Sequence, residues 1–274
     1  MEKSVLVRLS VRAGLITLAM LAIWFGLDSF FNGSVWEGML VSKSALVVEY
    51  CEFNNVARFF HQRMNTYSNL AYFFFGVLIL LIANYDQSRL SSINRQNRLE
   101  AFPALSALMG LCFIYLSFGS AFFHASLTWI GQRVDMNGTY GITLVLVTIA
   151  LYHVLHGIRL TSLAKTVWVV SLVALIIVFL KVALLVSSAI LLPSLILSLL
   201  VLIAINYIQF RQKRSGIVAV ASLVLMVVAV KFRTLDVQKI GCDPHSLVQG
   251  HSIWHLLTAL SSVCSYSFFR FAKQ

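Results

Sequence analysis

Long apolar runs constrain the fold of this chain more than any other feature. A helix that crosses about 30 Å of hydrocarbon needs roughly 20 apolar residues. Backbone polar groups inside lipid must be satisfied within the protein, which favours helices for such runs. The expected spans cover about 13–31, 66–85, 103–126, 135–157, 164–181, 187–209, 215–231 and 249–270. The sequence therefore predicts an all-α, multi-pass transmembrane helix bundle.

The composition agrees with a membrane protein and excludes other classes. Of the 274 residues, 59% are apolar and only 11% charged, which lies outside the usual range of soluble domains. No linker-like segment divides the chain, so we expect an N-terminal anchor helix within 1–35 and one membrane domain, 36–274. The net charge of +11 comes mostly from short segments between the apolar runs, a pattern typical of membrane topology. We expect no nucleic-acid partner and no obligate protein partner.

Basic residues between the runs indicate how the chain is oriented. Lys3, Arg8 and Arg12 precede the first run, and the segments on the same side carry a moderate excess of Lys and Arg. The positive-inside rule then predicts that both termini are cytoplasmic. We interpret the first run as an uncleaved anchor, because no clear small-x-small cleavage site follows it; a cleaved signal peptide is the alternative.

Two of the four cysteines fall in loops on the predicted outer side. Cys51 precedes the second run and Cys242 precedes the last one. They either form a disulfide or stay unpaired, because sequence does not show proximity. Cys112 and Cys264 lie inside predicted helices, where we expect them to be small apolar core residues.

Several polar side chains gather near one predicted membrane depth. Ser120 and His124 are four residues apart near the outer end of the third run, so they share a helical face. Asp135 begins the fourth run, and His251 and His255 repeat the four-residue spacing at the start of the last run. Ionisable groups in a span are costly unless they are paired, face a cavity or bind an ion, and three histidines are a ligand set of catalytic zinc. The alternative is that these histidines form hydrogen bonds at helix ends.

The remaining histidines form no comparable pattern. We interpret them as interfacial or solvated side chains. They are His61, His153, His156 and His245.

Three segments of the chain resemble the signature segments of the alkaline ceramidases. This family belongs to a wider membrane hydrolase superfamily that includes the progestin and adiponectin receptors. The segments are YCEFNNVARFFHQRMNTYSN (50–69), FGSAFFHASLTWIGQRVD (118–135) and HSIWHLLTA (251–259). The resemblance covers residues 49 to about 270 and implies a seven-helix core, to which the first run adds an extra N-terminal helix.

The resemblance also implies roles for particular residues. The zinc ligands are three histidines, His124, His251 and His255. Asp135 would hold and deprotonate the water on the metal, and Ser120 would stabilise the oxyanion of the tetrahedral intermediate. A disulfide would join Cys51 to Cys242.

The family's first segment also binds calcium through acidic and amide oxygens. The corresponding residues are Glu49, Glu52, Asn54 and Gln62. Here Glu49 replaces an aspartate and Gln62 an acidic residue, and calcium prefers several hard, charged oxygens. A weakened calcium site and a loop of hydrogen-bonding polar residues are the two interpretations.

The implied activity is hydrolysis of the amide bond of ceramide or a ceramide-like N-acyl lipid, giving a fatty acid and a sphingoid base. The active site would lie towards the outer or luminal side. One alternative is a hydrolase of another N-acyl or ester lipid, and another is a non-catalytic, ligand-sensing membrane receptor. Ser120 and Asp135 beside the three histidines favour an enzyme.

Overall fold

The computed structural model describes residues 1–89 and 97–271, except for the side chains of residues 183 and 184. It confirms the predicted all-helical class, since the described residues hold only isolated β-bridges and no strand. The long helices are α1 (Lys3–Phe30), α4 (Leu70–Ser88), α5 (Pro103–Ser126), α6 (Trp129–Val154), α7 (Ser162–Leu185), α8 (Ser188–Gln209), α9 (Gly216–Val237) and α10 (Gly250–Arg270). Short helices η1 (Gly33–Trp36), α2 (Lys43–Leu46) and α3 (Arg63–Ser68) lie in the connections.

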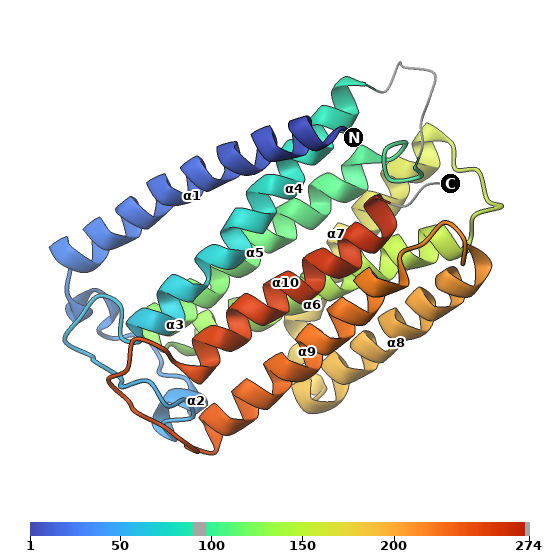
Figure 1. The fold of residues 1–274 in the computed structure, drawn as a ribbon. Helices are drawn as coiled ribbons and strands as arrows, with labels where there is room; N and C mark the ends of the chain where they lie inside the picture. Colours follow the sequence, from blue (N-terminus) through green and yellow to red (C-terminus); the bar gives the residue numbers. More distant parts are fainter. Residues whose placement is uncertain (90–96, 272–274) are drawn as a thin grey trace.

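The helices form one elongated bundle, and α10 runs through its middle (Figure 1). Helix α10 contacts α3, α4, α6 and α9, while α1 lies at one edge against α4. Helices α4, α5 and α6 are largely buried by their neighbours, whereas α7, α8 and α9 expose most of their apolar side chains. In a membrane those exposed faces would meet lipid tails.

The last helix differs from the expectation of eight apolar spans. Among the described residues, seven helical segments are long and apolar enough to cross a membrane, with α3 and α4 counted as one, and α10 is not among them. Its histidines, serines and threonines lower its hydropathy, yet they find partners inside the bundle. Ser261 and Ser265, for example, form hydrogen bonds with Ser222 of α9. Polar side chains between helices are compatible with a span when they are satisfied in this way.

Close packing of α5 against α6 sets the geometry of the polar residues. A Cβ placed on Gly138 would lie 2.8 Å from the Cα of Leu116, and one on Gly119 would lie 2.9 Å from a methyl carbon of Val134. Glycine at these positions lets the two backbones approach more closely than any other residue would. Ser120 and Asp135, the neighbours of Gly119 and Val134, are thereby brought to the same level of the bundle.

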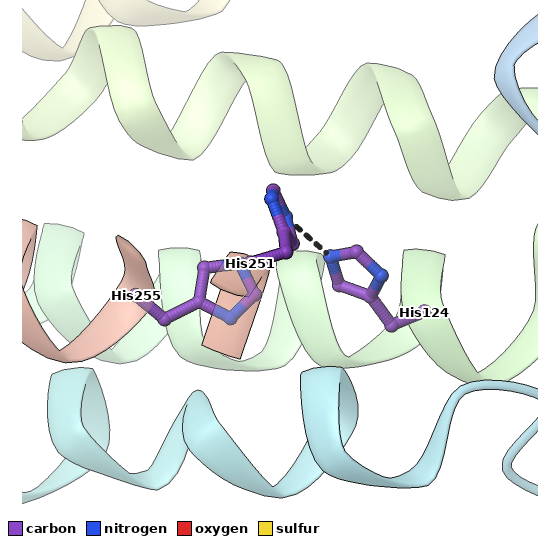
Figure 2. Close-up of side chains that lie close together, drawn as sticks. All are labelled: His124, His251 and His255. Carbon is purple, nitrogen blue, oxygen red and sulfur yellow. Dashed lines mark hydrogen bonds between the residues drawn. The ribbon is translucent and has the colours of Figure 1, made fainter. Parts of the chain in front are cut away.

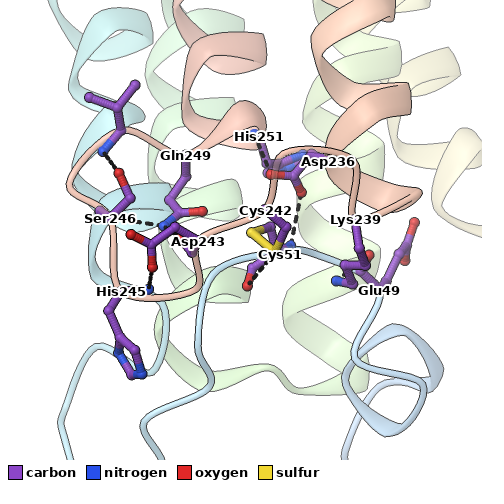
Figure 3. Close-up of a disulfide and its surroundings, with 11 residues drawn as sticks. Glu49, Cys51, Asp236, Lys239, Cys242, Asp243, His245, Ser246, Gln249 and His251 are labelled. Atoms are coloured by element: carbon purple, nitrogen blue, oxygen red, sulfur yellow. Dashed lines mark hydrogen bonds between the residues drawn. A yellow bond between two sulfur atoms is a disulfide. The ribbon is translucent and has the colours of Figure 1, made fainter.

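The predicted disulfide is confirmed. Cys51 and Cys242 are bonded, with their Cα atoms 5.7 Å apart, and they join the segment before α3 to the loop before α10 (Figure 3). Cys112 is buried and Cys264 half-buried within their helices, both as free thiols.

Two of the remaining histidines differ from the prediction of an interfacial or solvated role. His153 is fully buried against Phe269, and His61 is also buried. The helical pattern could not reveal this burial, because both sites are covered by segments distant in the sequence.

Candidate metal centre

Three histidines from two helices point their rings at one small volume of the bundle interior (Figure 2). Helix α5 supplies His124, and the first turns of α10 supply His251 and His255. One ring nitrogen from each histidine lies within 4.8 Å of the others, and the Nε2 atoms of His124 and His251 are 3.2 Å apart. All three side chains are buried, with exposures of 0%, 4% and 3%.

Hydrogen bonds at the ring nitrogens that point away from the cluster orient two of the three rings. The Nδ1 atom of His124 lies 2.7 Å from Oε1 of Gln62, which only accepts. The Nδ1 atom of His255 lies 2.7 Å from Oγ of Ser68, whose own hydroxyl donates to the backbone carbonyl of Asn65. Both histidines therefore carry their proton on Nδ1, which leaves the Nε2 lone pairs directed into the cluster. Metal-binding histidines are commonly held by such partners.

The third ring is held by stacking and by its backbone. His251 stacks on Tyr50, with ring centroids 4.0 Å apart. Its backbone N–H donates to Oδ1 of Asp236, whose Oδ2 accepts from the backbone N–H of Cys51 (Figure 3). Asp236 thus ties the end of α9 to the start of α10 and to the disulfide. The Nδ1 atom of His251 is buried and has no hydrogen-bond partner among the described residues.

The donor set fits a metal ion. Nitrogen ligands at 2.0–2.1 Å in a tetrahedral site lie about 3.4 Å apart, close to the 3.2 Å between His124 and His251. With the proton of His124 on Nδ1, its Nε2 lone pair faces Nε2 of His251, and at this distance either a proton carried by His251 or a cation lies between the two nitrogens. Three buried imidazoles, two with a fixed tautomer, are therefore arranged as ligands and can hold a metal ion.

The predicted serine and aspartate lie beside the histidines. Oγ of the buried Ser120 is 3.5 Å from Nε2 of His255. The Ser120 hydroxyl also faces the carboxylate of Asp135, which is half-buried. The structure therefore brings together all five residues that the sequence analysis placed in the site, because α5, α6 and α10 meet at this level.

The four residues assigned to a calcium site have protein partners in the structure. Glu49 pairs with Arg233 at 3.3 Å. Both oxygens of Glu52 accept backbone N–H groups at the start of α3, at 2.6 and 2.8 Å. Gln62 donates to Asn54 at 2.7 Å and accepts from His124. These contacts match the alternative of a hydrogen-bonded polar loop, and calcium binding stays a prediction.

Burial also changes the acidity of Glu52, which lies outside the helices. Loss of hydration raises the pKa of this carboxyl to about 7, although its two backbone N–H donors and the nearby Arg63 act in the opposite direction. The carboxyl therefore titrates near neutral pH.

Two residues that support the centre follow no recognisable pattern in the sequence. Ser68 orients His255, and Asp236 accepts from the backbone of His251. These partners are separated by 187 and 15 residues along the chain, and no spacing rule connects them. The only sequence signal for Ser68 is its place inside the first signature segment, and Asp236 had none.

An apolar cavity of about 330 Å³ adjoins the centre. Its walls come mainly from α6, α8, α9 and α10. Thr258, one turn after His255, and Thr139, one turn after Asp135, line it, as does Tyr72, whose ring lies 6.2 Å from that of His255. The cavity therefore lies within about one helical turn of the polar centre.

Fold and site together define a multi-pass helical membrane protein with a buried three-histidine centre beside an apolar cavity. The family model described as Ceramidase matches residues 43–274, and the chain belongs to this family. No curated protein and no solved structure matches the chain. Membership supports hydrolysis of lipid amides as the general activity and a lipid as the substrate.

Proposed function

We propose that this protein hydrolyses the amide bond of ceramide or a ceramide-like N-acyl lipid in a zinc-dependent reaction, releasing a fatty acid and a sphingoid base. The observation that carries the proposal is the meeting of three histidines, Ser120 and Asp135. An apolar cavity lies beside them, and its lining includes Thr139 and Thr258, one turn from Asp135 and His255. Soft or borderline nitrogen ligands suit zinc, whereas calcium prefers oxygen.

The side chains around the centre would have separate tasks. When bound, a zinc ion supplies Lewis acidity and lowers the pKa of water towards neutrality. Asp135 would accept the proton of the attacking water and deliver it to the leaving amine, which departs poorly without protonation. Ser120, beside Asp135 and His255, would donate to the oxygen that becomes negative in the tetrahedral intermediate.

The cavity supports a long-chain substrate. Its lining is mostly aliphatic and aromatic, and each methylene group buried there contributes about 0.8 kcal/mol. An acyl or sphingoid chain in the cavity would place the amide bond near the histidines. Chain burial therefore binds the lipid and positions its reacting group at once.

The active site would lie at the outer or luminal end of the bundle, with both termini cytoplasmic. The disulfide supports this orientation, because such bonds persist in oxidising compartments. It lies in the loops at one end of the bundle, and the start of α1 and the end of α10 lie at the other end (Figure 1).

Fatty-acid release and zinc content together test the proposal. The purified protein in detergent would be assayed on a panel of N-acyl sphingoid bases, other N-acyl lipids and ester lipids. We expect wild type to contain about one zinc per chain, His255→Ala to lose it, and Asp135→Asn to keep it while turnover falls by about 10²–10⁴-fold. His245→Ala, an exposed histidine in the outer loop, is the matched control.

The same panel distinguishes the alternatives. Turnover of esters alone would replace the amide substrate with an ester lipid. Stoichiometric zinc without turnover of any lipid would contradict the enzyme and favour the receptor.

A further inference from the structure

We propose that the N-terminal helix α1 positions the metal centre, and that Asp28 is its key positioning residue. This helix lies outside the residues matched by the family model, and an anchor helix needs no contact with a site. The inference rests on the proposed function in one respect, because it takes His124 and His255 as metal ligands.

Asp28 connects α1 to the loop before α3. Its side chain is only 2% exposed and lies between two arginines, with Oδ2 2.8 Å from Nε of Arg63 and 3.5 Å from Nη1 of Arg58. Oδ1 accepts the backbone N–H of Phe60 at 3.2 Å. A buried carboxylate with several partners of this kind holds them in place, because separating them leaves a charge uncompensated.

The residues around Asp28 hold the same loop at further points. Trp24, one turn earlier on α1, packs edge-on against Phe60, with ring centroids 6.3 Å apart. After the helix, the N–H of Gly33 donates to the carbonyl of Ala57 at 3.1 Å, and the indole N–H of Trp36 donates to Phe59 at 2.8 Å.

The loop in turn holds the residues that orient the rings of His124 and His255. The backbone N–H groups of His61 and Gln62 donate to the last carbonyls of α5, including that of His124, and the Gln62 side chain holds the His124 ring. Arg63 begins α3, which carries Ser68, the partner of His255. A shift of residues 57–63 would therefore displace both side chains that fix the tautomers.

Cobalt binding tests this role without any lipid substrate. Apo protein would be titrated with Co²⁺ while the visible absorption of the bound ion is recorded. Outer-shell changes typically reduce metal affinity 10–100-fold, and we expect Asp28→Asn to weaken Co²⁺ binding about tenfold and to alter the spectrum. Glu37→Gln removes a carboxylate from an exposed position of the same N-terminal segment. This variant should change neither the Co²⁺ affinity nor the absorption spectrum. Asp28→Glu, which restores the charge, should recover most of the affinity.

A combined variant shows whether Asp28 acts through the loop. In a background of Gln62→Ala and Ser68→Ala, which removes both side chains that the loop positions, adding Asp28→Asn should reduce the affinity by less than a further threefold. A further tenfold reduction, equal to that in wild type, would overturn the proposed route. Trp36→Phe removes the indole N–H together with part of the ring and keeps an aromatic side chain. It is the milder variant if Asp28→Asn does not fold, and unchanged Co²⁺ affinity in folded Trp36→Phe would also overturn the proposal.

Hydrogen exchange separates this inference from the proposed function. If wild type binds no Co²⁺, the metal centre itself is contradicted, whereas exchange at residues 57–63 still tests the role of α1. Faster exchange there in Asp28→Asn than in Glu37→Gln supports positioning of the loop. Equal exchange in the two variants contradicts it.

Discussion

At the scale of single residues, the centre depends on hydrogen bonds that determine where protons lie. The side-chain carbonyl oxygen of Gln62 accepts hydrogen bonds from His124 and Asn65, and its amide group donates one to Asn54. Ser68 acts similarly for His255. An imidazole is a metal ligand only through an unprotonated nitrogen, so these two neutral side chains prepare the ligands without adding charge to a buried site.

Glu52 makes the stability of the loop before α3 depend on pH. Its folded-state pKa of about 7 lies above the ordinary value of 4.5, so unfolding releases a proton between these values. The stability that the protonated form contributes is full below pH 4.5 and is lost as pH rises through about 7, by about 1.4 kcal/mol for each pH unit between the two pKa values. Thermal unfolding in detergent with chelator should show this loss in wild type and Glu37→Gln, but not in Glu52→Gln.

The same variants test the calcium site. At pH 8, added Ca²⁺ should raise the unfolding midpoint of wild type and leave Glu52→Gln unchanged if the ionised carboxyl binds the ion. No rise in wild type would contradict the calcium site and leave the hydrogen-bonded loop as its role.

At the scale of helices, the contact between α5 and α6 decides whether the acid and the metal ligands meet. His124 and Ser120 are on α5, and Asp135 is on α6. Gly119 and Gly138 allow the two backbones to approach closely near Ser120 and Asp135. Helix α10 completes the centre, and its own polar side chains are tolerated because α4, α5 and α9 supply partners, such as Tyr72 for Thr258.

Moving α6 away from α5 should reduce turnover more than it reduces the zinc content of the protein. In Gly138→Ala, the added methyl would lie 2.8 Å from the Leu116 backbone and push α6 away, which we expect to cost about 1–3 kcal/mol of stability. A shift of about 1 Å at Asp135 would reduce turnover by up to about 100-fold. Zinc content should stay near one, because the ligands lie on α5 and α10.

Gly14→Ala is the matched control for this change. It gives the same gain in helix propensity, and a methyl there meets nothing within 4 Å. If Gly138→Ala matches this control in turnover of an N-acyl lipid and in unfolding midpoint, the close contact does not position Asp135.

At the scale of the whole molecule, the start of α1 and the end of α10 lie opposite the disulfide-linked loops (Figure 1). The N-terminal segment adds a helix to one edge of the bundle, against α4, and its end meets the loop before α3. This end of the bundle thus carries the disulfide, the polar loop and the segment after α1. This arrangement places the histidines beneath a covered end rather than in an open cleft.

Labelling of introduced cysteines tests the orientation of the bundle. With a membrane-impermeant maleimide on intact cells or spheroplasts, Glu37→Cys should react from outside, and Lys213→Cys only after permeabilisation, because both positions are exposed at opposite ends. Wild type is the background control, since Cys112 and Cys264 lie within the helices. The reverse labelling pattern would contradict cytoplasmic termini.

The sequence by itself determined the helical class, the approximate spans and the five polar residues of the centre. These follow from local quantities: runs of about 20 apolar residues and four-residue spacings that place side chains on one face. The expected spans were shorter than the helices at several ends, for example at the ends of α7 and α9 and at the starts of α1 and α6. Helix α1 begins at Lys3, because charged side chains near an end reach towards water, and α6 begins at Trp129, because Thr128 caps its N-terminus.

Only the tertiary structure decided how these residues are held. Gln62 lies 62 residues from His124, Ser68 lies 187 residues from His255, and Asp28 lies 32 residues from Phe60. Hydrogen bonds and ion pairs act over about 3 Å and depend on where whole helices pack, so the sequence around either partner does not encode them. The chemistry of the centre is local in sequence, whereas its geometry comes from contacts between distant segments.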